Sequence, residues 1–344
     1  MISPAFANVV QSTVGSWISN QPSYAEACKV LDEPERLSQE VSADLKAAFE
    51  DSTQQDFHAF SAEAWASPYV LLPQAFVAEQ LPATPLDFLP IPSCAGTLMA
   101  RLSAIAALGA LGMETVSYGS ENNGDLFVNL VALPGDTRMA NKSRGAMRGH
   151  TDAVSFPFRG QTDATNPDIA PSPDFVSLCG LRNPDTIPTT VMPLAEALAE
   201  LTPEQVAELK KQQFGIRSQK TFIPGMKVLL GYEHSVEDGE LLLDVDGKTW
   251  IRYSHSSVDV DVENAAATAA NNALVAACAQ HCKTVSIQPG DVLLVNNRLA
   301  LHGRSEVGGQ HGGESRWLLR TYGLDTRGLT KGQRYAHPPY MLVP

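Results

Sequence analysis

Beyond residue 125 the sequence breaks into short apolar runs of β-type composition, separated by turn residues and irregular polar segments. Runs of this length are typical of a β-sandwich or barrel and favour a jelly roll. No glycine-rich phosphate-binding loop follows any of the runs, which argues against a doubly wound parallel sheet. The expected strands comprise residues 126–131, 175–181, 226–232, 285–295 (with a turn at Pro289 and Gly290) and 317–322.

The chain is expected to form a single domain over residues 1–344, mainly β with flanking helices. Residues 1–118 form a mainly helical N-terminal scaffold in this interpretation, and residues 119–344 form the jelly-roll core. Helical insertions are expected near residues 193–213 and 263–281. The helical first third provides either internal packing or the surface of a homodimer. A group of acidic residues between 237 and 246 predicts a solvated hairpin.

Composition excludes several kinds of partner. The 25 Lys and Arg residues against 38 Asp and Glu residues give a net charge of −13, and no basic cluster is visible for holding a nucleic-acid backbone. No uncharged stretch is apolar enough to predict a membrane segment, and the first 25 residues lack the basic start of a secretory signal. The five scattered cysteines favour a reducing compartment, so a cytoplasmic location is expected.

A histidine and a carboxylate stand two positions apart at His150 and Asp152. Residues two apart on an extended strand point to the same face, so this pair can offer an imidazole and a carboxylate to one metal ion. About one such pair is expected by chance in a chain of this composition, and the hypothesis therefore needs a third ligand. His302 supplies one, because it follows a glycine turn and an apolar run that predicts a strand. Two histidines and one carboxylate leave positions open on a metal, as in non-haem Fe(II) oxygenases.

Two arginines follow His302 at positions 316 and 320. A spacing of four on a strand places Arg316 and Arg320 on the same face, while Trp317 and Leu319 point away. A guanidinium is suited to a bidentate grip on a carboxylate, which a 2-oxoacid co-substrate offers at its far end.

These motifs, in this order between residues 119 and 323, resemble the clavaminate synthase-like branch of the Fe(II)/2-oxoglutarate-dependent oxygenases, near its asparagine and arginine hydroxylases and within the superfamily of taurine dioxygenase. The resemblance rests on residues 123–130, on His150 with Asp152, on residues 175–183 with Thr189 and Thr190, on residues 290–304, and on residues 316–320. It implies a double-stranded β-helix core. It also implies hydroxylation of an unactivated carbon of a free amino acid or small derivative, with 2-oxoglutarate and O2 consumed and succinate and CO2 released.

The resemblance also implies roles for individual residues. Fe(II) would be held by His150, Asp152 and His302, and the remote carboxylate of 2-oxoglutarate by Arg316, with help from Thr189 or Thr190. Arg320 is similar to an arginine that meets the substrate carboxylate. Glu121 and Asn122 stand near the region that contacts the substrate amino group, unless they belong only to an exposed polar loop. Asp259 and Asp261 are similar to acids that bind a basic substrate side chain, although their alignment depends on a gap.

Other readings of the same residues stay open. Asp152, the second ligand along the chain, is an aspartate where relatives often carry glutamate. This difference keeps the negative charge and makes the side chain one methylene shorter. An intact carboxylate favours hydroxylation over halogenation, whereas desaturation or cyclisation at the same iron centre depends on the substrate pose. A zinc-dependent hydrolase or cupin-like enzyme could use the same three ligands, but it has no need of Arg316. A third reading is a non-catalytic jelly-roll binding protein. His255 is expected to be a solvated side chain.

Overall fold

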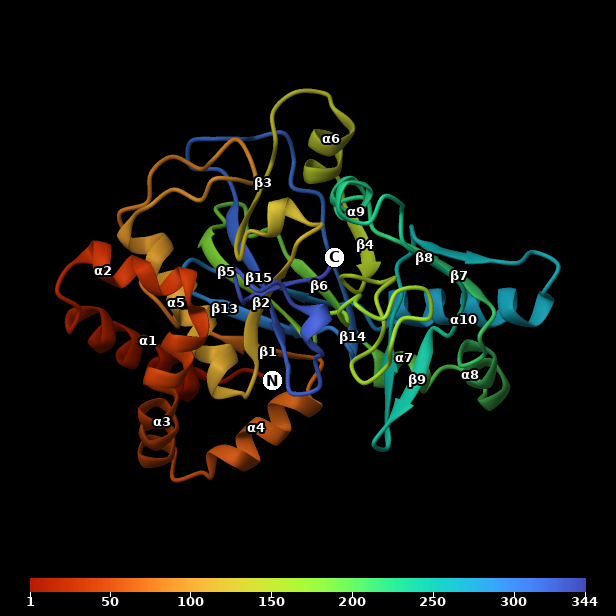
Figure 1. The fold of residues 1–344 in the computed structure, drawn as a ribbon, viewed down its shortest axis with the longest axis horizontal. Helices are drawn as coiled ribbons and strands as arrows, with labels where there is room; N and C mark the ends of the chain where they lie inside the picture. The colour runs from red at the N-terminus through yellow and green to blue at the C-terminus, as the bar shows by residue number, and fades with distance from the viewer.

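A computed structural model describes residues 1–344 of the chain. Figure 1 shows helices gathered at two sides of a central set of strands. The helices are α1 (Pro4–Ser19), α2 (Tyr24–Lys29), α3 (Pro34–Thr53), α4 (Phe57–Ala66), α5 (Ala95–Ala110), α6 (Arg138–Arg144), α7 (Leu194–Leu198), α8 (Pro203–Leu209), α9 (Ile223–Leu229) and α10 (Ala265–Gln280), with short 3-10 turns at Val30–Asp32, Asn122–Gly124 and Lys331–Gln333.

Two sheets form the centre of the molecule. The larger one has seven strands in the order β1-β13-β5-β15-β2-β16, and β3 also pairs with β15. Its strands are β1 (Tyr69–Leu72), β2 (Glu114–Tyr118), β3 (Val128–Val131), β5 (Phe175–Arg182), β13 (Val292–Asn296), β15 (Trp317–Leu324) and β16 (Met341–Leu342). The smaller sheet has four strands in the order β12-β6-β14-β4. These are β4 (Met147–His150), β6 (Thr189–Pro193), β12 (Lys283–Val285) and β14 (Ala300–Arg304).

Side-chain alternation divides the apolar residues of the larger sheet between two layers. On β15, Trp317 and Leu319 pack against the N-terminal helices, whereas Leu318 and Tyr322 point between the sheets. The neighbouring strands β5 and β13 alternate in the same way. Because the side-chain period of a strand is two, the same alternation turns Arg320 toward the space between the sheets. The alternation that places apolar side chains of β15 in the core therefore also directs Arg320 toward the site described below.

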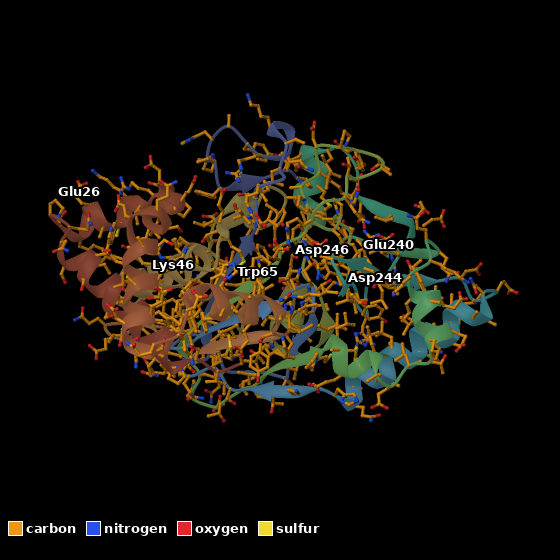
Figure 2. All side chains as sticks on the ribbon, turned by 90° about the horizontal axis from the view of Figure 1, so that it is seen from below. Glu26, Lys46, Trp65, Glu240, Asp244 and Asp246 are labelled. Carbon is orange, nitrogen blue, oxygen red and sulfur yellow. The ribbon has the colours of Figure 1, made fainter.

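The outer face of the larger sheet is covered by α1, α3 and α5, with α2 and α4 beside them, whereas α7, α8 and α10 lie on the opposite side of the molecule (Figure 1). Helix α5 is buried along most of its length because it lies between the sheet and helices α1 and α3. A cluster of four phenylalanines, Phe6, Phe49, Phe57 and Phe60, joins α1, α3 and α4, with ring centroids 4.6 to 6.0 Å apart. In Figure 2 these helices occupy one end of the molecule, and Trp65 lies where they meet the rest.

Two small sheets complete the opposite end. One has three strands in the order β11-β7-β8, and the other is the hairpin β9-β10. Helices α7 and α8 lie within residues 193–213, and α10 lies within residues 263–281. The strands of the small sheets are β7 (Phe214–Arg217), β8 (Ser235–Gly239), β9 (Leu242–Val245), β10 (Lys248–Ile251) and β11 (Val258–Val260). No helix of the structure combines the length and the apolar character needed to cross a bilayer.

Two expectations about local structure are wrong. Residues 226–232 do not form a strand, because α9 covers most of them. Pro224 fits the first turn of a helix, and the run that follows leaves Val228 83% exposed instead of burying an alternating face. The acidic segment is only partly solvated. Its Asp246 stands in the turn of the β9-β10 hairpin, but Glu240 is buried and forms an ion pair with Arg252 at 3.2 Å.

Candidate metal centre and active-site cavity

Three possible metal ligands meet at one end of the smaller sheet. Strands β4 and β14 are antiparallel neighbours, and their register places His302 directly opposite His150. Gly303 allows this close pairing, since a Cβ there would lie 2.3 Å from the carbonyl oxygen of Met147. Asp152 follows β4 and faces both histidines: its carboxylate oxygens lie 3.6 Å from Nε2 of His150 and 3.6 Å from Nε2 of His302. One ligand atom from each residue lies within 4.8 Å of the others, and all three side chains are buried.

The backbone around Asp152 is held by side chains from two distant segments. The Asp152 N–H donates to Oδ1 of Asn297 at 2.9 Å, and Nδ2 of Asn297 donates to the Asp152 carbonyl at 3.1 Å and to the Pro173 carbonyl at 3.0 Å. Gln219 clamps the adjoining residues, because its amide donates to the Thr151 carbonyl at 3.0 Å and accepts from the N–H of Ala153 at 2.9 Å. These contacts fix the carboxylate relative to β4 and β14.

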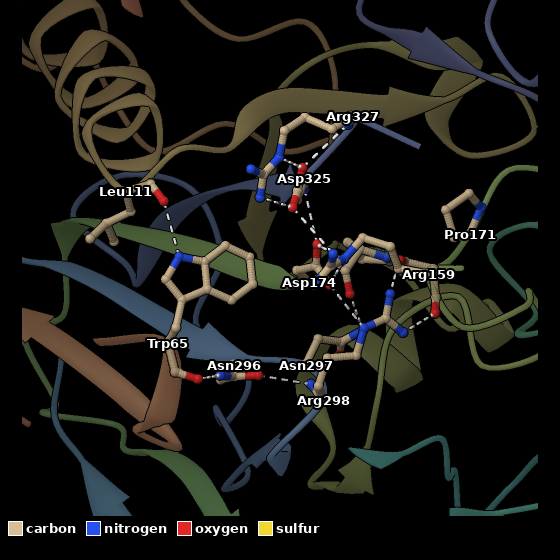
Figure 3. Close-up of polar contacts among 12 residues, drawn as sticks. Trp65, Leu111, Arg159, Pro171, Asp174, Asn296, Asn297, Arg298, Asp325 and Arg327 are labelled. Carbon is tan, nitrogen blue, oxygen red and sulfur yellow. Dashed lines mark hydrogen bonds and ion pairs between the residues drawn. The ribbon is translucent and has the colours of Figure 1, made fainter. Parts of the chain in front are cut away.

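Asn297 is in turn anchored by its sequence neighbours. Figure 3 shows Asn296 bound to the Trp65 carbonyl and Arg298 bound to Asp174. Arg298 is buried, and its Nε donates to a carboxylate oxygen of Asp174 at 3.1 Å. The turn between β13 and β14 is therefore fixed to the N-terminal part of the chain and to the segment before β5.

The protonation state of His150 favours metal binding. Nδ1 of His150 donates to the carbonyl of Arg148 at 3.0 Å, which leaves the lone pair of Nε2 facing Asp152. Burial, followed by repulsion from His302, lowers the pKa of His150 to about 4. Burial alone would raise the pKa of Asp152, but the neighbouring imidazole of His302 and the charges of Arg320 and His150 outweigh it and lower that pKa. Nδ1 of His302 is buried without a hydrogen-bond partner. A carboxylate and two imidazoles at this spacing are suited to a divalent transition metal.

The ligands open onto a cavity of about 140 Å³ between the two sheets, here called the inner cavity. Arg316 stands in its wall, is 4% exposed, and has no carboxylate within 4.0 Å and no hydrogen-bond partner at Nε. Burial, then repulsion from Arg304, lowers the pKa of Arg316 to about 9. A buried guanidinium without a counter-charge favours the binding of an anion, which would lie in the inner cavity.

A second polar group in the inner cavity combines opposite charges. Arg320 donates to the Glu121 carboxylate at 2.6 Å, and the hydroxyl of Tyr322 donates to the same carboxylate at 2.9 Å. All three side chains are largely buried. Burial would lower the pKa of Arg320, but Glu121, Tyr322 and Asp152 outweigh it and raise that pKa above its ordinary value. Nε of Arg320 has no partner, so the pair has capacity left for a ligand.

The structure brings most of the residues singled out from sequence into this cavity. Its walls include Glu121, Asn122, His150, Asp152, Thr189, His302, Arg316 and Arg320. Thr190 does not line the cavity, because adjacent residues of β6 point to opposite faces. Asp259 does not line it either: it lies on β11, is exposed, and pairs with Arg217 at 2.6 Å. Asp261 is exposed and accepts a hydrogen bond from the N–H of Glu263.

Three residues at the site were not singled out as functional from sequence. Asn297 contacts the backbone of Asp152 from 145 residues away, and Gln219 contacts that of the adjoining Ala153 from 66 residues away, in contacts that no local spacing predicts. His255 is not simply solvated, since its Nδ1 contacts the carbonyl oxygen of Gly149 at 2.7 Å, beside His150. The only local signal for Asn297 is its place in a polar turn between two apolar strands.

Comparisons with known proteins agree with this fold. Residues 232–322 match the family model described as taurine catabolism dioxygenase TauD, TfdA family. An L-lysine 3-hydroxylase of Catenulispora acidiphila is 26% identical over 213 residues, which cover 60% of this chain and 54% of that protein. The match thus spans about half the length of this curated relative.

Solved structures resemble the chain over nearly its whole length. An asparagine oxygenase in complex with Fe(II), 3-hydroxyasparagine and succinate has a TM-score of 0.75 at 19% identity, covering 99% of this chain and 98% of that one. The non-heme iron oxygenase OrfP in complex with Fe has a TM-score of 0.74 at 20% identity, with the same coverage. The fold is therefore the double-stranded β-helix with flanking helices that the sequence predicts. The comparisons also confirm the predicted resemblance to the clavaminate synthase-like oxygenases.

Proposed function

We propose that the chain is an Fe(II)/2-oxoglutarate-dependent oxygenase that hydroxylates a free amino acid or a small amino-acid derivative. One observation carries the proposal. A carboxylate and two histidines meet at one end of a buried cavity whose wall holds an arginine without a counter-charge. A metal-dependent hydrolase would need the three ligands but not Arg316, so the arginine favours the oxygenase.

The donor set fits iron. His150, Asp152 and His302 would hold Fe(II) on one face and leave about three positions for the co-substrate and O2. When bound, the iron supplies the oxidative chemistry that couples decarboxylation of 2-oxoglutarate to hydroxylation of the substrate. In balance, 2-oxoglutarate, O2 and the substrate C–H bond give succinate, CO2 and an alcohol.

The remaining residues position the two organic molecules. Arg316 would bind the remote carboxylate of 2-oxoglutarate, and Thr189 lines the same cavity and would donate a hydrogen bond to it. The Arg320 and Glu121 pair would meet the opposite charges of an α-amino acid, with Arg320 on the carboxylate and Glu121 on the ammonium group. Asn122 lines the cavity beside Glu121.

The names of similar proteins support an amino acid as substrate, since they describe enzymes that act on lysine and asparagine. The five unpaired cysteines support a reducing compartment, and we place the enzyme in the cytoplasm.

The test is turnover of a panel of free amino acids and simple derivatives with Fe(II), 2-oxoglutarate and ¹⁸O-labelled O2. We expect succinate and a labelled, hydroxylated product in equal amounts for at least one substrate. Asp152→Ala should abolish both products, whereas Arg327→Ala, a change at an exposed arginine, should not. Tight Zn²⁺ binding with hydrolysis of an amide or ester, and no succinate, would contradict the proposal.

A further inference from the structure

A second and larger cavity lies outside the metal centre, here called the outer chamber. Its volume is about 630 Å³, against about 140 Å³ for the inner cavity. Its walls come from α6, the start of α9, β4 and the segments 217–220 and 254–257. In Figure 1, α6 and α9 lie next to each other above β4.

The two cavities are continuous, because they share five wall residues: Met139, Lys142, Met147, His150 and Gln219. Ligand pockets usually measure about 300–1,000 Å³. The inner cavity is smaller than that range and must also hold the co-substrate. The part of the substrate beyond the reacting carbon therefore extends into the outer chamber.

The charge of the outer chamber opposes that of the chain. Although the net charge of the protein is −13, the chamber wall contains one acid, Glu233, and five cations. The cations are Arg138, Lys142, Arg148, Arg217 and Lys220.

These cations are largely uncompensated. Arg217 pairs with Asp259 at 2.6 Å, and Glu233 is 3.8 Å from Lys227, which lies outside the chamber wall. No carboxylate lies within 4.0 Å of Arg138, Lys142, Arg148 or Lys220. Four cations without counter-charges around one concave surface create a positive potential directed at its contents.

Two of the four lie close to the reacting centre. Arg148 stands two positions before His150 on β4, across a register shift in the pairing of β4 with β14, and both residues line the outer chamber. Lys142 borders both cavities. Burial lowers the pKa of Lys142, and repulsion from Lys220 and Arg320 lowers it further, against attraction by Asp152 and Glu121. A bound anion would relieve the repulsion between these like charges.

Resting on the proposed function, we propose that the substrate is an amino-acid derivative with an anionic group, a phosphate or a carboxylate, at the end remote from its α-carbon. The α-amino acid end meets Glu121 and Arg320 in the inner cavity, and the remote anion lies among Lys142, Arg148 and Lys220. A lysine or arginine side chain would instead bring a cation against these residues. The substrate therefore differs in charge from the lysine named for the curated relative.

The experiment compares matched substrate pairs that differ in the remote charge. Glutamate with glutamine tests a carboxylate, and O-phosphoserine with serine tests a phosphate, with lysine and arginine as cationic references. Binding to the anaerobic Fe(II) and 2-oxoglutarate complex is measured by calorimetry at low and high salt, and turnover is measured as kcat/KM. We expect an anionic member to bind at least about tenfold more tightly than its neutral partner, with a preference that weakens in high salt.

Variants locate the effect. Lys220→Gln and Arg148→Gln should each weaken binding of the anionic member about fivefold and leave that of the neutral member unchanged. Arg36→Gln, a change at an exposed arginine of α3, is the matched control and should change neither. The absorption band of bound Fe(II) and 2-oxoglutarate should persist in all of these variants.

Several outcomes would overturn the proposal. These are equal or tighter binding of the neutral members, a preference for lysine or arginine, and turnover only of an amino acid tethered to an acidic carrier protein. Each of them leaves the oxygenase assignment intact. Absence of the Fe(II) and 2-oxoglutarate band in the wild-type protein would instead contradict the proposed function, so the two failures are distinguishable.

Discussion

In the proposed site Arg316 would bind the co-substrate, because it is a buried cation of the inner cavity that no carboxylate compensates. We predict that Arg316→Met raises KM for 2-oxoglutarate at least about tenfold, since a charge-assisted hydrogen-bonded pair is lost. Stability should rise or stay the same, because the substitution also removes an uncompensated buried charge. Steady-state kinetics and urea unfolding measure the two effects.

The control for this prediction is Arg327→Met, since Arg327 is exposed and lies outside the inner cavity. An unchanged KM in Arg316→Met would show that the co-substrate does not use this arginine.

Two substitutions of Asp152 test its role in the metal centre. Asp152→Glu keeps the charge and the oxygen ligand, so we predict measurable Fe(II) binding and turnover. Asp152→Ala removes the carboxylate from between two histidines, and we predict at least about a hundredfold loss of Fe(II) affinity. Competition with a coloured chelator under anaerobic conditions gives both affinities. An Fe(II) affinity of Asp152→Ala equal to that of the wild-type protein would exclude Asp152 as a ligand.

At the scale of elements, the site depends on how the turn between β13 and β14 is fixed to the segment that follows β4. Asn297 makes that connection through three hydrogen bonds, two of them to the backbone of Asp152. We predict that Asn297→Ala weakens Fe(II) binding about tenfold and destabilises the protein by about 1–3 kcal/mol, because buried polar groups lose their partners.

Asn129→Ala is the matched control for Asn297→Ala. Asn129 is equally buried and hydrogen-bonded, but its amide contacts Trp317 and the carbonyls of Asp87 and Pro90. Its loss should destabilise the protein by a similar amount and leave Fe(II) affinity unchanged. Equal losses of Fe(II) affinity in both variants would mean that stability alone, and not positioning, explains the effect of Asn297.

The elements also show what the sequence can predict and where it fails. Strands β5 and β15 follow from runs of apolar residues, and the proposed ligands follow from local spacing, because His150 and Asp152 are two residues apart and His302 follows a glycine turn and an apolar run. Helix α9 is different. Apart from Lys227 its residues are apolar or small, a composition that also fits a strand. Pro224 in the first turn and the close packing of Gly225 against Ser120 favour the helix.

Polar contacts between residues far apart in the sequence cannot be predicted from local patterns either. The contacts of Glu240 with Arg252 and of Gln219 with the backbone near Asp152 depend on the folded arrangement of loops. The acidic residues around Glu240 predict a solvent-exposed segment. Glu240 is nevertheless buried, and its carboxylate needs the counter-charge of Arg252, which only the folded chain brings next to it. Spacing in the sequence identifies residues whose side chains can bind a metal or a ligand, and the fold decides which of them share a cavity.

At the scale of the whole molecule, the N-terminal helices stabilise the sheet from outside. Phe49 contacts Phe6, Phe57 and Phe60 within the cluster that joins α1, α3 and α4. We predict that Phe49→Ala lowers the free energy of unfolding by about 3–5 kcal/mol, because it leaves a cavity in a packed core. Denaturant unfolding measures the loss. Val228→Ala, at an exposed position of α9, should change stability by less than about 0.5 kcal/mol.

One complex tests the proposed function most directly. Fe(II) and 2-oxoglutarate are added to the metal-free protein without O2, and the metal-to-ligand charge-transfer absorption is recorded against Arg316→Met and Asp152→Ala. We predict a band in the wild-type protein that is lost in Asp152→Ala and needs much more 2-oxoglutarate in Arg316→Met. No band in the wild-type protein, with tight Zn²⁺ binding in its place, would contradict the account and favour a hydrolase.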